Sequence, residues 1–373
     1  MNTEASPRTV FARFMEEDIL DEMGRLLYSI LNIFATNGYR VELFDNINFS
    51  ALDKYGQQVP SLDNLTLVDA IPDNTEDRLY LFDRADKSCS KRRWQKKIQV
   101  KFDIFSTYRL TDPLFMPYPV HPLLSGADLP QRLEQLRKNQ KKLRIFFSGD
   151  TKGYTRNRIH YPNTKLPRLE VINTLLEQRA DRTIHVKDED TLRELLDGDF
   201  VDSCIIVDTG SMWIDPQEWL PDLSKSDFFI CPPGYCMPMC HNVIEAMSVG
   251  AIPIISYPEW FNPTLRHMEN CIVFDDKEDL IRKIDHVLEM EPHVVPALRE
   301  RVIAYYEEHL SPQNFIDAIE SREDSKITVL MITDKNTRKN AGRLNRRSIL
   351  ITGKATFAGS WWYRVLRSFG VAG

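Results

Sequence analysis

The sequence contains no long apolar run. None of its 373 residues lies in an uninterrupted stretch of about 18 apolar side chains, the length that crosses a bilayer as a helix. The first residues, Met1 to Val10, are polar and lack the apolar core of a signal peptide. We therefore expect neither a transmembrane helix nor a secretion signal, and the expected location is the cytoplasm.

The sequence also lacks an excess of basic charge and a recognisable set of metal ligands. Its formal net charge of −6 argues against a protein that coats nucleic acid, so we expect no nucleic-acid partner. Three of the six cysteines and one histidine form the pattern C-x4-C-x3-C-H over residues 231–241, which matches no common zinc or iron–sulfur spacing. We expect no bound metal, and we expect cysteines that are free thiols packed in the interior.

No Gly-x-Gly-x-x-Gly follows the first expected strand, and no short repeat of fixed period is present. The missing glycine pattern argues against a dehydrogenase or epimerase that binds a dinucleotide. The missing repeat argues against a solenoid. A chain of 373 residues exceeds one ordinary hydrophobic core, so its length predicts two domains of roughly 150 residues each.

The first part of the chain has the pattern of an α/β repeat. Apolar side chains from Glu16 to Thr36 follow helical spacing, and Asn37-Gly38 is a stop signal for that helix. Tyr39 to Phe44 alternates between apolar and polar residues and predicts a strand. Further strands are predicted at 79–82 and 98–102. A proline-rich segment at 115–124 is expected to cross between domains, and a charged helix follows at 129–142.

The second part alternates more regularly between short apolar runs and amphipathic segments. Such alternation predicts parallel strands joined by crossover helices, and so two Rossmann-like α/β domains. The strands are expected at 143–147, 204–208, 228–231, 252–256 and 272–274, and the helices at 166–178, 188–196, 241–248 and 278–290. We place the first domain at 1–140, the second at 141–310, and a crossing helix with a basic aromatic tail at 311–373.

The segment that carries the chemistry is 226–257. Its strand is broken by Pro232-Pro233-Gly234, and a helix that Gly250 closes begins near His241. A parallel sheet binds ligands at the carboxyl ends of its strands, and the free N–H groups of the following helix suit a pyrophosphate. Glu245 lies one turn into that helix, where a carboxylate can accept both hydroxyls of a ribose.

This segment resembles the donor domain of GT-B glycosyltransferases, and most of all the exostosin-like group. The resemblance rests on Pro232-Pro233-Gly234-Tyr235, Glu245-Ala246-Met247, Gly250 and Pro253-Ile254-Ile255. It also rests on Phe147-Ser148-Gly149 and the basic loop after it, and it covers about residues 143–290. A GT-B fold implies two Rossmann-like domains that face a cleft, here with a basic C-terminal extension.

The resemblance implies a nucleotide-sugar donor, a UDP- or GDP-sugar, and no required cofactor or metal. It implies that Glu245 binds the ribose and that Arg156 and Arg158, with Lys152, neutralise the diphosphate as it leaves. The residues expected to bind the donor are Gly149, Lys152, Tyr154, Arg156, Arg158, Gly234, Tyr235, His241, Asn242 and Glu245.

A general base is required only if the transfer inverts the anomeric centre. His121 in the proline-rich segment and Asp150 at the end of a strand are the two candidates. The sequence leaves inversion and retention open. It also leaves open the plainer interpretations, in which Glu245 is an exposed helix residue, Arg156 and Arg158 are surface charges, and His241 caps its helix.

The C-terminal residues differ in charge from the rest of the chain. Residues 322–373 contain eleven Lys or Arg and three Asp or Glu, a net charge of +8, so the remainder carries −14. Aromatic residues beside arginines at 360–369 suit a membrane interface, and a helix packed on the first domain is the equal alternative.

From this charge we expect a glycan or lipid-linked glycan acceptor in cell-envelope polysaccharide synthesis, with the protein peripheral on the inner face of the membrane. The main alternative is a non-catalytic two-domain protein that binds a sugar or nucleotide. Such a protein would keep the two domains but would not need paired arginines beside a glutamate.

Overall fold

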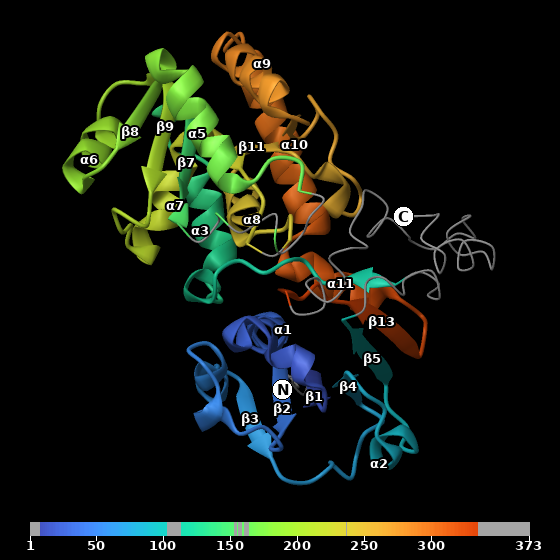
Figure 1. The fold of residues 1–373 in the computed structure, drawn as a ribbon. Coiled ribbons are helices and arrows are strands. Elements are labelled where there is room, and N and C mark those ends of the chain that lie inside the picture. Colours follow the sequence, from blue (N-terminus) through green and yellow to red (C-terminus); the bar gives the residue numbers. More distant parts are fainter. Residues whose placement is uncertain are drawn as a thin grey trace, which may run out of the picture. The chain divides into compact units, whose positions relative to one another are not determined.

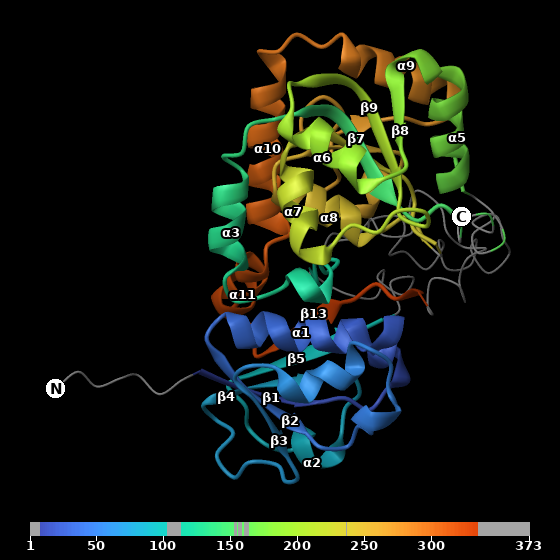
Figure 2. The same ribbon diagram turned by 90° about the vertical axis from the view of Figure 1, so that its left-hand side faces the viewer.

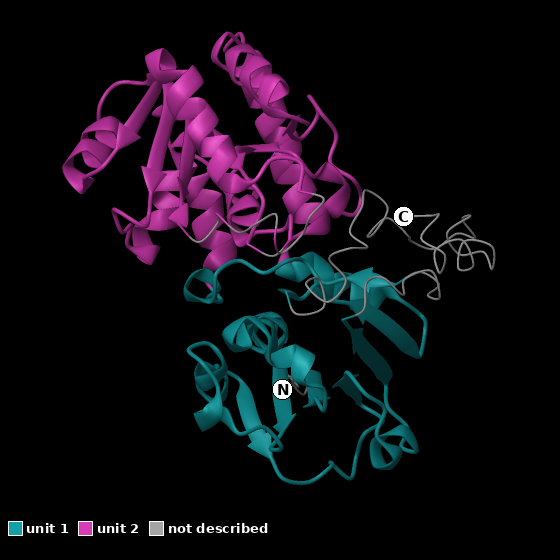
Figure 3. Cartoon of the chain, viewed as in Figure 1, with its two compact units in different colours: residues 1–127, 312–339, 351–373 teal, residues 128–311, 340–350 magenta. Residues whose placement is uncertain are grey.

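The computed structural model describes residues 8–102, 113–152, 155, 159, 164–235 and 237–334. These residues divide into two compact units (Figure 3). Unit 1 contains residues 8–127 together with 312–334, and unit 2 contains residues 128–311. Because 312–334 returns to unit 1, the described part of the chain crosses between the units twice.

Unit 1 is built on seven parallel strands in the order β3-β2-β1-β4-β5-β13-β6 (Figure 1). The strands are β1 (Arg8–Arg13), β2 (Tyr39–Phe44), β3 (Leu65–Val68), β4 (Arg78–Phe82), β5 (Lys96–Lys101), β6 (Leu114–Phe115) and β13 (Lys326–Leu330). The interior strand β1 pairs with β2 on one side and with β4 on the other. The chain runs outward from β1 in both directions, which is the Rossmann pattern.

Two faces of this sheet are covered by different elements (Figure 2). Helix α1 (Arg25–Thr36) packs on the face of Val10, whereas α2 (Lys87–Ser90) lies on the face of Phe11, because neighbouring strand residues point to opposite sides. Phe11 stacks on Trp94 with ring centroids 5.5 Å apart. The short helices of unit 1 are η1 (Glu17–Leu20), η2 (Glu22–Gly24), η3 (Phe49–Ala51), η4 (Gly56–Ser61) and η6 (Pro122–Leu124).

The prediction of one helix from Glu16 to Thr36 is wrong. The backbone adopts positive φ at Glu22, Met23 and Gly24, so the segment divides into η1, η2 and α1. A Cβ on Gly24 would lie 2.5 Å from the Cα of Gly56, so close contact with η4 requires glycine there. Apolar periodicity continued through this break because residues on both sides of it face the same core.

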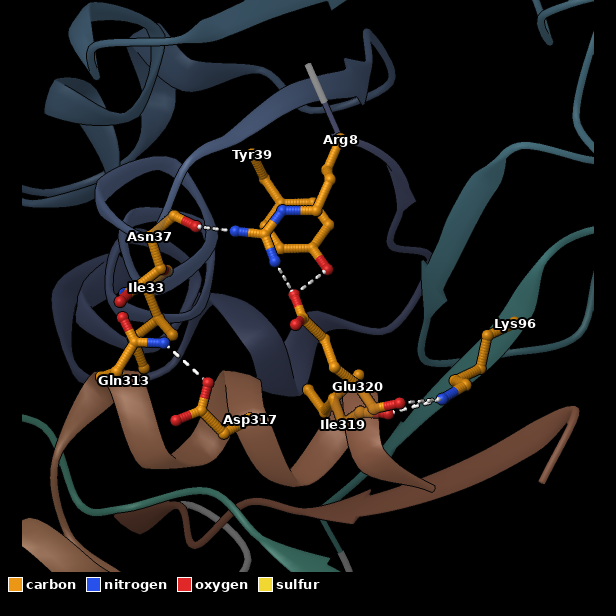
Figure 4. Close-up of polar contacts among 9 residues, drawn as sticks. All are labelled: Arg8, Ile33, Asn37, Tyr39, Lys96, Gln313, Asp317, Ile319 and Glu320. Carbon is orange, nitrogen blue, oxygen red and sulfur yellow. Dashed lines mark hydrogen bonds and ion pairs between the residues drawn. The ribbon is translucent and has the colours of Figure 1, made fainter. Parts of the chain in front are cut away.

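Helix α11 (Pro312–Ser321) packs on α1 within unit 1 and is fixed by polar side chains (Figure 4). Glu320 forms an ion pair with Arg8 and accepts a hydrogen bond from the Tyr39 hydroxyl at 2.7 Å. Lys96 donates to the carbonyl oxygens of Ile319 at 2.6 Å and Arg322 at 2.5 Å. A cation at these last carbonyls stabilises the helix end, so Lys96 has a structural role here.

Unit 2 is built on six parallel strands in the order β12-β11-β10-β7-β9-β8. The strands are β7 (Leu143–Gly149), β8 (Thr183–Val186), β9 (Val201–Asp208), β10 (Ser226–Cys231), β11 (Ile252–Ile255) and β12 (Ile272–Val273). After β7 the chain passes to the outer strand β8 and then returns to β9, which lies between them. It then crosses to the other side of β7 to form β10, so the connections diverge between β7 and β10.

Helices cover both faces of this sheet, with α5 and α9 on one side and α3 and α10 on the other (Figure 2). Helices α7 and α8 contact each other, and α8 contacts α10, which places all three on one face. The helices are α3 (Leu129–Leu136), α5 (Arg168–Gln178), α6 (Glu189–Asp197), α7 (Pro216–Ser224), α8 (His241–Ser248), α9 (Lys277–Leu288) and α10 (Val294–His309), with the short η8 (Ala180–Arg182) and η9 (Pro258–Trp260).

A buried ionic contact attaches α10 to this sheet. Arg144 of β7 donates to Asp227 of β10 at 3.2 Å, and Arg299 of α10 forms an ion pair with the same carboxylate. Asp227 is buried, and its charge is compensated by the guanidinium groups of Arg144 and Arg299.

The prediction of two Rossmann-like α/β halves is confirmed by these two parallel sheets. The predicted cleft concerns the placement of the units relative to each other and stays a prediction. Across the described part of the chain, no helix combines the length and apolar character needed to span a membrane.

Candidate functional site

The ends of β7 and β10 form the place in unit 2 where a ligand is expected. The two strands are neighbours, and their following connections leave in opposite directions. In open parallel sheets such a divergence leaves a crevice at the carboxyl ends of the strands, where ligands bind. The segments that meet there are the loop after β7, the loop after β10 and the first turn of α8.

The loop after β10 folds back tightly on itself. Pro232, Pro233 and Gly234 are buried, and Tyr235 is half-buried. A Cβ on Gly234 would lie 2.4 Å from the carbonyl oxygen of Met239, so only glycine allows the later part of the loop to pass so close. This fold-back brings the end of the loop to the start of α8.

Helix α8 begins beside the end of β7. Its N-cap residue Cys240 makes no side-chain capping bond, and its first turn contains no acidic residue. Asn242, which is half-buried with His241 in that turn, donates from Nδ2 to the carbonyl oxygen of Ser148 at 3.2 Å. The positive end of the helix dipole therefore lies at the carboxyl edge of the sheet, where it favours an anion.

The residue that joins these loops is Arg168, which the sequence analysis did not identify. It is the first residue of α5, and only 3% of its surface is exposed. It donates to the carbonyl oxygens of Pro233 at 3.2 Å and Asp150 at 3.3 Å, and to Sγ of Cys240 at 3.4 Å. A cation at a helix N-terminus is unfavourable because it opposes the helix dipole. An arginine at the start of a predicted helix was therefore the signal in the sequence that could have identified Arg168.

The loop after β7 is held from two sides. A Cβ on Gly149 would lie 3.3 Å from Nη1 of Arg168, which explains the small residue. Asp150 is exposed and accepts from the backbone N–H of Lys152 at 2.8 Å. The Lys152 ammonium donates to the carbonyl oxygen of Gly210 at 2.6 Å, so in this structure it fastens the loop after β9.

Glu245 is buried rather than exposed on α8, with 1% of its surface accessible. Its Oε2 accepts a hydrogen bond from the indole N–H of Trp219 on α7 at 2.7 Å. The interpretation of Glu245 as an exposed helix residue is therefore wrong. Its predicted contact with a ribose stays a prediction.

His121 lies in unit 1, at the start of η6. Its Nδ1 accepts from the backbone N–H of Leu123 at 3.3 Å, and its Nε2 lies 2.6 Å from the hydroxyl of Tyr55. Because Nδ1 accepts a hydrogen bond, the neutral ring carries its proton on Nε2 and donates it to Tyr55. The predicted role of His121 as a base stays a prediction, as does that of Asp150.

Three predicted donor ligands, Tyr154, Arg156 and Arg158, lie outside the described residues. Neutralisation of a diphosphate by the two arginines therefore stays a prediction. The residues that the structure does bring together at the carboxyl edge of unit 2 are Gly149, Asp150, Lys152, Gly234, Tyr235, His241, Asn242 and Arg168.

The cysteines of this region are thiols in packed surroundings. Cys231 is buried, and burial raises its pKa well above the ordinary value for a thiol. Cys240 is half-buried beside Arg168, and Cys236 lies outside the described residues. Within the described ranges, no three His, Cys, Asp or Glu side chains are placed to hold a metal ion.

No protein-family model matches the chain, and no curated protein matches it in sequence. The chain is similar to the solved structure of an alpha-glucosyltransferase in complex with UDP and a 13-mer DNA that contains an A:G mismatch. The two sequences are 12% identical, the match covers 85% of this chain and 99% of that chain, and the TM-score is 0.42. It is also similar to HepE of Anabaena in complex with UDP and glucose, with 12% identity, 84% and 98% covered, and a TM-score of 0.42.

A glycosyltransferase of Rickettsia africae is similar over 85% of this chain and 98% of its own, with 9% identity and a TM-score of 0.45. Likenesses of this size assign no activity and no residue role to the present chain.

Proposed function

We propose that this chain transfers a glycosyl group from a nucleotide-sugar donor to an acceptor hydroxyl. The observation that carries the proposal is the junction at the carboxyl edge of unit 2. There the loops after β7 and β10 meet the N-terminus of α8, and the buried guanidinium of Arg168 joins them. Glu245 lies one turn further along the same helix.

These groups suit the two ends of a nucleoside diphosphate. A helix N-terminus with a nearby guanidinium stabilises negative charge, which the diphosphate gains as it leaves the sugar. A carboxylate accepts hydrogen bonds from vicinal hydroxyls such as those of a ribose. We propose that Arg156, Arg158 and Lys152 contribute further positive charge, and that the donor is a UDP- or GDP-sugar.

We further propose a glycan or lipid-linked glycan as acceptor, in cell-envelope polysaccharide synthesis, at the inner face of the membrane. The support is the net charge of +8 over residues 322–373 and the aromatic residues near its end. Flotation with anionic vesicles tests this part. The full chain should float and a chain that ends at Ala341 should not, whereas equal behaviour of the two would refute it.

The donor proposal is tested by calorimetry and thermal unfolding of the full chain with UDP-, GDP-, CMP- and dTDP-sugars. One nucleotide class should stabilise the protein, by about 2.7 kcal/mol at a hundredfold excess over its Kd. Glu245→Ala should weaken binding at least about tenfold, since it removes hydrogen bonds to a charged acceptor. Glu194→Ala on α6 is the matched control, because Glu194 is an exposed helix residue.

The outcomes separate the possible functions. Release of the nucleotide on addition of acceptor (the diphosphate from a UDP-, GDP- or dTDP-sugar, or CMP from a CMP-sugar) supports transfer. The anomeric configuration of the product distinguishes inversion from retention. Binding without such release favours a non-catalytic nucleotide-binding protein. Failure of every nucleotide to bind overturns the proposal.

A further inference from the structure

Trp219 reaches across from α7 to the carboxylate of Glu245. Its indole Nε1 donates to Oε2 over 2.7 Å. The half-buried indole ring packs against two phenylalanines of the sheet, with centroids 6.3 Å from Phe146 and 5.8 Å from Phe229. The ring is therefore held by packing, and its single N–H has one fixed direction.

This contact is one of those that orient the Glu245 carboxylate. An indole N–H only donates, so it occupies one lone pair, whereas an ionised carboxylate offers about four acceptor positions. Because the carboxylate is buried, a hydrogen-bond position that faces a ligand is costly to leave unfilled. A carboxylate fixed in this way distinguishes strongly between a ligand that supplies a hydroxyl and one that lacks it.

A second observation indicates a ligand on the same face of the sheet. Ser148 shares a strand face with Phe146, because residues two apart on a strand point to the same side. Ser148 is buried, and its hydroxyl has no hydrogen-bond partner among the described residues. Buried hydroxyls of this kind are uncommon in folded proteins, and a bound polar molecule is one way to satisfy them.

We propose that Trp219 is a positioning residue that gives the site its selectivity for ribonucleotides over 2′-deoxyribonucleotides. Its N–H holds the Glu245 carboxylate in the direction from which it accepts the ribose hydroxyls. Without that N–H the carboxylate turns or binds water. The hydrogen bond that it accepts from the 2′-hydroxyl then contributes less to the affinity for the ribose form. The inference rests on the proposed function, because it assumes that the site binds a nucleotide.

The test is calorimetry on the full chain with UDP, 2′-deoxy-UDP, GDP and 2′-deoxy-GDP. The wild-type protein should bind the ribose form of its nucleotide about 10-fold to 100-fold more tightly than the deoxy form, which corresponds to one or two good hydrogen bonds to a charged group. Trp219→Phe keeps an aromatic ring and removes the N–H. It should lower this ratio to about threefold or less, mainly through weaker binding of the ribose form.

Trp94→Phe is the matched control. The Trp94 indole in unit 1 also donates a hydrogen bond, to the carbonyl oxygen of Cys89 at 2.9 Å, so the same chemical group is lost elsewhere. This variant should keep the wild-type ratio. Trp219→His, which retains a ring N–H, should recover part of the selectivity, and it provides the comparison if Trp219→Phe fails to fold.

The results separate the two proposals. A Trp219→Phe protein that binds nucleotides with the wild-type ratio overturns the role of Trp219 and leaves the proposed function standing. The role of Trp219 is also overturned if the wild-type protein binds the ribose and deoxy forms equally, or if Trp219→His shows no selectivity. The proposed function stands in both cases. A wild-type protein that binds none of the four nucleotides overturns both.

Discussion

In unit 1 a carboxylate holds the loop after β1 at the carboxyl edge of the sheet. In unit 2 a guanidinium joins the loops after β7 and β10, and the carboxylate of Asp208 holds the loops after β7 and β9. Asp83, buried at the end of β4, accepts from the backbone N–H of Met15 through both oxygens at 2.9 Å and from that of Glu16 at 2.7 Å. Arg168 instead donates to the carbonyl oxygens of Pro233 and Asp150. The contacts to Asp83 therefore engage backbone N–H groups in unit 1, whereas the edge of unit 2 is held through carbonyl groups at Arg168 and through N–H groups at Asp150 and Asp208.

The two edges differ in the charged groups that contact their loops. In unit 1 the pKa of Glu16 is raised by burial and by the neighbouring carboxylates Asp83 and Asp18. In unit 2 the helix N-terminus and Arg168 both contribute positive potential. The positive groups of the second edge suit the diphosphate proposed above. The fold determines where a ligand can bind, and the loop side chains determine its charge.

The largest effect is expected from Arg168→Met. Loss of the guanidinium leaves two carbonyl groups of the edge without their donor, at a cost of about 3 kcal/mol, since hydrogen bonds from charged groups contribute about 1.5–3 kcal/mol each. Amide exchange over residues 143–152 and 228–240 of the full chain should accelerate, and nucleotide binding should be lost. Arg266→Met, at an exposed position of unit 2, is the control and should change the free energy of opening by less than about 0.5 kcal/mol. Unchanged exchange in Arg168→Met would show that the cation does not hold this edge.

A smaller effect is expected from Asp83→Asn. The amide accepts through one oxygen only, so either the Glu16 N–H or the Arg84 N–H loses its partner, at a cost of about 2 kcal/mol. Exchange at Met15 and Glu16 should accelerate, while nucleotide binding should stay within about twofold of wild type. Asp45→Asn, an exposed carboxylate that follows β2 at the same edge, is the matched control. If Asp83→Asn abolished nucleotide binding as Arg168→Met does, the contrast between the edges would not hold.

The smallest effect is expected from Glu16→Gln, and it depends on pH. The pKa of Glu16 is higher in the folded protein than in the unfolded chain, where it is about 4.3. At pH values between these two pKa values the folded state binds more protons than the unfolded state. Stability therefore falls as pH rises through that window. The neutral glutamine removes this loss, and its advantage over wild type should grow from pH 4 to pH 7 while remaining below about 1 kcal/mol.

The measurement for Glu16 is the denaturant dependence of amide exchange in β1 at pH 4 and pH 7. Glu17→Gln removes one negative charge at the adjacent, exposed position and serves as the control. An advantage for Glu16→Gln that is equal at both pH values would contradict the crowding of carboxylates at this edge.

The sequence alone determined the elements whose signals are local. Helix α8 occupies the predicted residues, because its apolar spacing and the positive φ of Gly250 after its end are encoded within ten positions. Strand β2 was predicted from alternation in the same way. The sequence also indicated that the ends of β7 and β10 form the ligand-binding edge, since parallel strands end at a common edge.

Only the tertiary structure decided which strands join a sheet and which polar groups meet. Strand β1 carries little apolar pattern of its own and becomes an interior strand of unit 1 through pairing with β2 and β4. Strand β13 joins β5 of the same sheet from the far end of the chain. Arg168 meets Pro233 across 65 positions and Trp219 meets Glu245 across 26. Helical and strand periodicities extend over a few residues, so contacts between distant segments leave no periodic trace in the sequence.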